Sequence, residues 1–133
     1  MTTQRLQVSL LLLRLSVFLV MLMWTLDKIV NPDHAAKVFE SFYFIGGLGA
    51  TVMKVIGGVE LVVILAFVAG LAKRWTYGFV LLVHAVSTLS SFRVYLDPFA
   101  SPNLLFFAAW PMLAACVTLY LLRDEDRLAS LGR

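Results

Sequence analysis

Hydrophobic residues along this chain gather in four long runs, which cover roughly residues 6–26, 45–71, 75–95 and 103–122. About 20 helical residues cross the ~30 Å hydrocarbon core of a bilayer, and each run reaches this length. Only helices and closed barrels satisfy their backbone groups in lipid, and continuous apolar runs of this length are helical. The pattern therefore predicts an all-α membrane protein. We expect a single domain over residues 1–133, folded as a four-transmembrane-helix up-down bundle.

The polar stretch between the first two runs contains a shorter helical pattern. Asn31-Pro32-Asp33 is typical of a helix start, with Asn31 as the N-cap and Pro32 at the first helical position. Apolar side chains then recur at helical spacing, at Ala35, Val38, Phe39, Phe42 and Tyr43. We predict a short amphipathic helix over about 32–43 that lies on the membrane surface. Only Ala72-Lys73-Arg74 separates the second and third runs, so those helices should be antiparallel neighbours.

Basic residues near the ends of the runs indicate the orientation of the chain. The side that would hold both termini collects Arg5, Lys73, Arg74, Arg123, Arg127 and Arg133. The other side collects Lys28, Lys37 and Arg93 together with Asp27, Asp33, Glu40 and Asp97. Cytoplasmic loops carry the excess of Lys and Arg, so we expect both termini in the cytoplasm and the amphipathic helix on the extracytoplasmic side.

Composition narrows the class of protein further. Hydrophobic residues make up 61% of the chain, well above the roughly 45–50% of soluble domains, which excludes a soluble domain. The single Cys116 excludes a self-contained thiol–disulfide oxidoreductase. The small net charge of +3 includes no basic patch interleaved with aromatics, so we expect membrane lipids rather than nucleic acid as partners. His34 and His84 fall at different depths, and no metal or haem site is predicted.

Three ionisable residues, Arg14, Glu60 and His84, lie in the middle of separate apolar runs. Counted from the cytoplasmic ends of their runs, all three fall ~12–17 Å deep. Charges inside a bilayer are costly and usually find partners within the protein. We therefore predict an Arg14–Glu60 ion pair with His84 bonded to the carboxylate. This triad could serve as structural glue, as a proton relay or as the polar head of a ligand pocket; no catalytic residue is assigned.

Three further residues complete the candidates for ligand binding or proton relay. Lys54 lies toward the outer end of the second run, where its side chain can snorkel to the interface. Lys28 follows Trp24 and Asp27 at the outer end of the first run. Trp110 is deeper, beside Pro111, so its indole N–H needs a partner or a cavity near the expected kink.

Several short motifs are similar to those of the DoxX family of small four-helix integral membrane proteins. They are Arg14-Leu15-Ser16 followed by Trp24 and Lys28, then Gly57-Gly58-Val59-Glu60-Leu61, and finally Gly70-Leu71-Ala72-Lys73-Arg74. The resemblance implies a bacterial-type inner (plasma) membrane protein. Some members of the family are linked to terminal oxidases, to thiosulfate:quinone oxidoreduction or to oxidative-stress complexes. Related thiol-redox bundles use cysteine pairs, which this chain lacks, so an intrinsic activity is not implied.

These observations favour a DoxX-like subunit or accessory protein of a quinone-linked membrane redox system. A quinone or a lipid headgroup near Arg14, Glu60 and His84 is the candidate ligand, quinone is the one candidate cofactor, and a membrane or soluble oxidoreductase is the candidate partner. Two alternatives stay open. One is a small proton-coupled carrier in which Glu60 changes protonation. The other is a structural scaffold that recruits a soluble partner through its 123–127 tail. The glycine-rich second run also allows a homo-oligomer.

Overall fold

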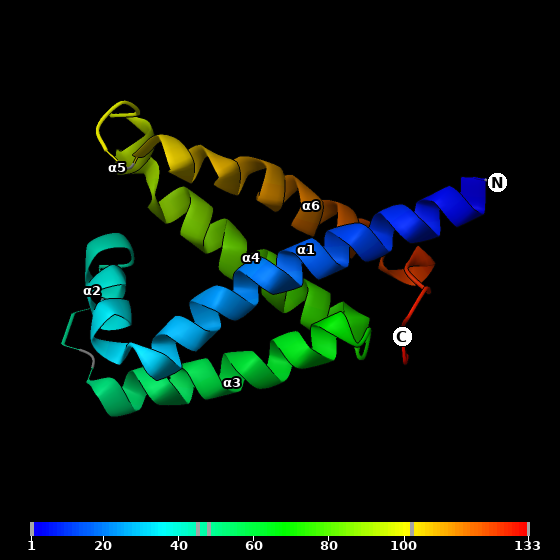
Figure 1. Cartoon of the computed structure of the whole chain (residues 1–133), viewed down its shortest axis with the longest axis horizontal. Coiled ribbons are helices and arrows are strands. Elements are labelled where there is room, and N and C mark those ends of the chain that lie inside the picture. Colours follow the sequence, from blue (N-terminus) through cyan, green and yellow to red (C-terminus); the bar gives the residue numbers. More distant parts are fainter. Residues whose placement is uncertain (1, 45, 48, 102, 133) are drawn as a thin grey trace.

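The computed structural model describes residues 2–44, 46–47, 49–101 and 103–132, and every regular element in these ranges is helical (Figure 1). The order is α1 (Thr2–Val30), α2 (Pro32–Phe42), α3 (Ala50–Val68), α4 (Lys73–Ser90), α5 (Phe92–Tyr95), the 3-10 helix η1 (Asn103–Ala108), α6 (Ala109–Leu121) and the 3-10 helix η2 (Arg123–Glu125). Ile45, the expected start of the second run, and Arg133, one of the residues used for orientation, lie outside the described residues.

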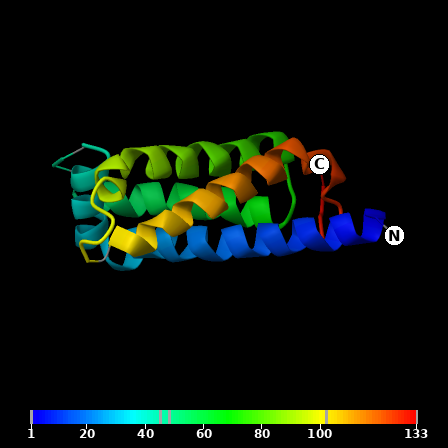
Figure 2. The same cartoon turned by 90° about the horizontal axis from the view of Figure 1, so that it is seen from above.

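The long helices pack side by side. α1 runs along α3 and contacts α6, while α4 runs along α6 and contacts α3. The short α2 packs across α1 and α3 at one end of the molecule, and both termini lie at the opposite end (Figures 1 and 2). The first turns of α1 extend beyond the end of α3 (Figure 2). The molecule therefore has two distinct ends, an α2 end and a termini end.

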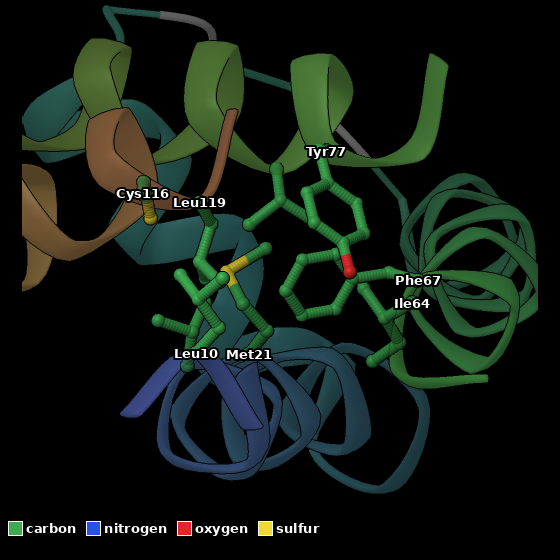
Figure 3. Close-up of a cluster of buried hydrophobic side chains, with 9 residues drawn as sticks. Leu10, Met21, Ile64, Phe67, Tyr77, Cys116 and Leu119 are labelled. Atoms are coloured by element: carbon green, nitrogen blue, oxygen red, sulfur yellow. The ribbon is translucent and has the colours of Figure 1, made fainter. Parts of the chain in front are cut away.

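The core lies between α1, α3, α4 and α6 (Figure 3). Phe67 and Tyr77 meet edge to face there, with ring centroids 4.9 Å apart. Large apolar side chains also cover the outward faces of the helices, at Leu12, Leu19, Val55, Val62, Leu82 and Leu121. Soluble monomers rarely expose apolar surface on this scale, whereas lipid covers it at no cost.

Three helices of the described residues are long and apolar enough to cross a membrane. They are Thr3–Val30, Ala50–Val68 and the combined 3-10 and α segment Asn103–Leu121. α4 does not join them, because Lys73, Arg74, Thr76, His84 and Thr88 lower the mean hydropathy of its 18 residues. The predicted third run also breaks near Ser91, where α4 ends and the short α5 begins.

The local sequence explains where the helices begin and end. α3 stops at Gly70, which has a φ of +74° and lies in a Schellman arrangement: Gly70 N–H donates to Phe67 O and Leu71 N–H to Ala66 O. Pro111 has no N–H and its ring crowds the carbonyl four residues earlier, which fits a 3-10 helix up to Ala108 with α6 following. The predicted helix over about 32–43 is present as α2, although the Asn31 side chain makes no capping bond.

Candidate functional site

Arg14, Glu60 and His84 do not meet. The carboxylate beside Arg14 is that of Asp126, with Nη1 and Oδ1 3.2 Å apart, whereas Glu60 pairs with Lys28. His84 Nε2 lies 2.9 Å from the carbonyl oxygen of Ala109. The predicted Arg14–Glu60 ion pair and its bond to His84 are therefore wrong, and the structure divides the charges between two sites.

The register between α1 and α3 explains this correction. A Cβ on Gly57 would lie 3.1 Å from Lys28 Cβ and 3.3 Å from Thr25 O, so this part of α3 sits directly on the C-terminal part of α1. Arg14 is 11 residues before Thr25, which places it about 16 Å away along the helix axis. The depth of Arg14 counted from Leu6 did not give its level relative to Glu60. α1 begins at Thr2, and its first turns extend past the end of α3 (Figure 2). Arg14 thus lies near the end of α3, far from Glu60.

The first site, which we call the Glu60 site, consists of Thr25, Lys28 and Glu60. Lys28 Nζ donates to Glu60 Oε2 at 3.1 Å, and Thr25 Oγ1 donates to the same oxygen at 3.2 Å. Lys28 and Glu60 are only 9% and 8% exposed, so each charge offsets much of the cost of burying the other. Both bonds reach Oε2, and no bond from a described residue reaches Oε1. The site therefore keeps a carboxylate oxygen and ammonium protons for a further polar group.

The α2 helix covers the Glu60 site. The ring of Phe39 lies 5.8 Å from Lys28 Nζ, in cation–π range, and packs edge to face on Tyr43. The Tyr43 hydroxyl is hydrogen-bonded to Ser87 Oγ of α4. Burial raises the pKa of Tyr43; the bond to Ser87 opposes this and the negative charge of Glu60 adds to it. Side chains of α1, α2, α3 and α4 thus converge around one buried carboxylate.

The second site, which we call the Asp126 site, lies at the termini end. Arg14 and Asp126 are both 0% exposed. Their 3.2 Å contact is an ion pair without hydrogen-bond alignment, because Arg14 Nη2 donates instead to Leu128 O at 2.7 Å and Ala129 O at 2.9 Å. The Tyr77 hydroxyl donates to Asp126 Oδ2 at 2.5 Å. Arg14 thus ties the C-terminal segment into the core.

Further bonds hold this segment in place. Gln7 Oε1 accepts from the backbone N–H of Arg127 and of Leu128, and Leu131 N–H donates to Ala69 O at 2.8 Å. Lys73 Nζ donates to the main-chain oxygen of Asp126. The scaffold hypothesis treats residues 123–127 as the contact for a soluble partner; Asp126 of this segment is buried against the helices, whereas Asp124, Glu125 and Arg127 are exposed. Sequence reasoning missed Asp126 because it lies in a run of charges; the available signal was that a buried Arg14 needs a carboxylate.

The other candidates have separate surroundings. A carbonyl only accepts, so the Nε2 of His84 carries the proton in its bond to Ala109, and the imidazole links α4 to α6. Lys54 is exposed, as snorkelling requires. Trp110 is 44% exposed and packs at a tilt against Tyr95, with ring centroids 5.4 Å apart and an angle of 49° between the ring planes. The structure brings only Lys28 and Glu60 of the six candidates into contact. No group of three or more potential metal ligands occurs among the described residues.

No protein-family model, no curated protein and no solved structure matches this chain. Function is therefore inferred from the geometry of the Glu60 site and from the apolar helices around it.

Proposed function

We propose that the chain is an integral membrane protein in which α1, α3, α4 and α6 form an up-down bundle with both termini in the cytoplasm. The three long apolar helices support this arrangement. α4 is about 27 Å long at 1.5 Å per residue, close to the ~30 Å of the hydrocarbon core. Its polar residues Thr76, His84 and Thr88 are buried rather than turned to lipid. In this arrangement α2 lies on the extracytoplasmic surface.

We further propose that the protein is a DoxX-like accessory subunit of a quinone-linked membrane redox system, and that the Glu60 site holds the quinone headgroup. The observation that carries this proposal is the Lys28–Glu60 pair itself. The two residues belong to the motifs that resemble the DoxX family, and they form one nearly buried contact. Intramembrane ionisable pairs of this kind commonly mark ligand or proton pathways.

The chemistry of the pair suits a quinone. Lys28 has ammonium donors for a ring carbonyl, and Glu60 Oε1 is open to a proton on a reduced ring hydroxyl. Phe39 provides an aromatic face beside Lys28, and the surrounding apolar helices suit an isoprenoid tail. The protein binds and orients the headgroup in this account, while the partner oxidoreductase supplies and removes electrons.

Lipid extraction and native mass spectrometry of protein purified in mild detergent test this function. We expect the wild type to retain a quinone. The amount of bound quinone should fall about tenfold in Glu60→Gln, because that change removes the charge that holds Lys28. Lys54→Gln is the matched control, since Lys54 is an exposed lysine on the same helix. A folded wild type that carries no quinone, or equal retention by Glu60→Gln, would contradict the proposal. Thermal unfolding of each variant checks that it is folded.

A further inference from the structure

A second location has the features of a ligand site. A recess of about 610 Å³ opens at the termini end, beside the folded-back C-terminal segment. Lys73, Arg123, Asp124, Arg127 and Ser130 line it, together with residues 131–132. Its volume falls within the ~300–1,000 Å³ of small-molecule sites. It belongs to neither the Glu60 site nor the core, since α2, which covers the Glu60 site, lies at the opposite end of the molecule (Figure 1).

The charges around this recess are unbalanced. Three of its side chains are cationic and one, Asp124, is a carboxylate. No carboxylate oxygen of the described residues lies within 4 Å of Lys73 or Arg123. Asp126 is close to Lys73, but its carboxylate is already engaged by Arg14 and Tyr77. Arg127 is paired with Glu125, with Nη2 and Oε2 3.2 Å apart, so among the described residues the unpaired positive charge of the recess is that of Lys73 and Arg123.

The donors are also held in place. Lys73 is only 4% exposed, and of its three ammonium protons one is used by the Asp126 main-chain oxygen. Arg123 Nη1 donates to Tyr120 O at 2.7 Å, and its guanidinium carbon lies over the Tyr120 ring, 4.4 Å from the centroid. These two contacts restrain the guanidinium, which has further N–H donors besides the one bonded to Tyr120. A nearly buried ammonium and an oriented guanidinium on one recess favour an anion with several oxygens.

We propose that this recess binds a phosphate group, with Lys73, Arg123 and Arg127 as the donors. Arginine forks and lysine point charges are the usual partners of phosphate oxygens. In the proposed topology the recess lies at the cytoplasmic surface, where anionic lipids concentrate. The group can therefore belong to a lipid headgroup or to free phosphate, which share this chemistry. The site stands independently of the quinone proposal, because no residue is common to both.

The test uses the full chain purified in mild detergent and two probes. Native mass spectrometry measures retention of phosphatidylglycerol against phosphatidylcholine, and calorimetry measures binding of inorganic phosphate. We expect saturable binding of at least one probe, weakened about tenfold or more in Arg123→Gln/Arg127→Gln because charge-assisted contacts are lost. Arg93→Gln, at the α2 end, is the matched control and should bind as the wild type does. Lys73 is left intact because it is buried and its replacement could unfold the protein.

The pattern of results identifies the source of the phosphate. If phosphatidylglycerol stays bound when inorganic phosphate is added, the recess is a site for a lipid headgroup. Saturable binding of inorganic phosphate, with or without displacement of lipid, indicates recognition of the phosphate group alone. The proposal is overturned if neither probe binds saturably, or if the folded double variant binds both probes as tightly as the wild type.

Discussion

Asp126→Asn should destabilise the protein by about 3–5 kcal/mol, the usual cost of leaving one member of a buried ion pair without its partner. Asparagine keeps the shape of the side chain and an acceptor for Tyr77, so the change removes little besides the charge. Arg14 is fully buried, and its two carbonyl bonds to Leu128 and Ala129 would remain. The decrease in the free energy of unfolding therefore measures the cost of leaving the Arg14 guanidinium buried without a counter-charge. Unfolding in mixed detergent–SDS micelles, followed by circular dichroism, measures it.

A double-mutant cycle separates this account from the arrangement expected from sequence. Arg14→Met and Asp126→Asn together remove both charges of the ion pair, so the double variant should lose much less than the sum of the single variants. We expect a coupling near the upper end of the ~0.5–3 kcal/mol seen for contacting residues. Arg14→Met and Glu60→Gln should be additive within about 0.5 kcal/mol, because Glu60 contacts α1 at Thr25 and Lys28, about 16 Å or more along the helix from Arg14. Strong coupling of Arg14 to Glu60 with none to Asp126 would refute the reasoning.

Glycine substitutions test the helix packing. Gly57→Ala should cost about 1–3 kcal/mol, because its Cβ would lie 2.7 Å from the Ile29 side chain, whereas Gly58→Ala meets nothing within 4 Å and should be neutral or stabilising in the same unfolding assay. An equal effect of the two changes would contradict the register of α1 on α3. Gly70→Ala should also destabilise by over about 1 kcal/mol, since Gly70 has a φ of +74° and its Cβ would meet Ser130 at 2.3 Å. Unchanged stability would contradict the packing of the C-terminal segment there.

The hydropathy of the chain predicted its helical class, three of its apolar helices and α2, because lipid exposure and helical periodicity are local properties. The fourth apolar helix remains a proposal, since the polar residues of α4 lower its hydropathy while the fold buries several of them. Helix ends were less accurate. α1 extends four residues past each expected end. A search for apolar residues misses these extensions because they contain polar residues such as Gln4, Arg5 and Asp27.

The sites depend on relations between helices, and these are not local. Lys28 and Glu60 were both candidates, yet their pairing follows from the contact of Gly57 with α1, which sets the register. Asp126 became the partner of Arg14 because the chain reverses after α6 and folds back on the termini end. A run of charged residues resembles a solvated helix end in sequence. Only the tertiary fold distinguishes the buried Asp126 from its exposed neighbours Asp124 and Glu125.

Labelling of single cysteines in intact cells tests the central claim most directly, namely that the helices cross the membrane with α2 outside and the termini inside. Cys116 is the only cysteine, so a Cys116→Ala background allows one new cysteine at Lys37 in α2 or at Arg74 near the α3–α4 turn. Both positions are exposed. We predict that a membrane-impermeant maleimide labels Lys37→Cys in intact cells and Arg74→Cys only after permeabilisation. Labelling of Arg74→Cys in intact cells, or labelling of neither position until the cells are opened, would contradict the account.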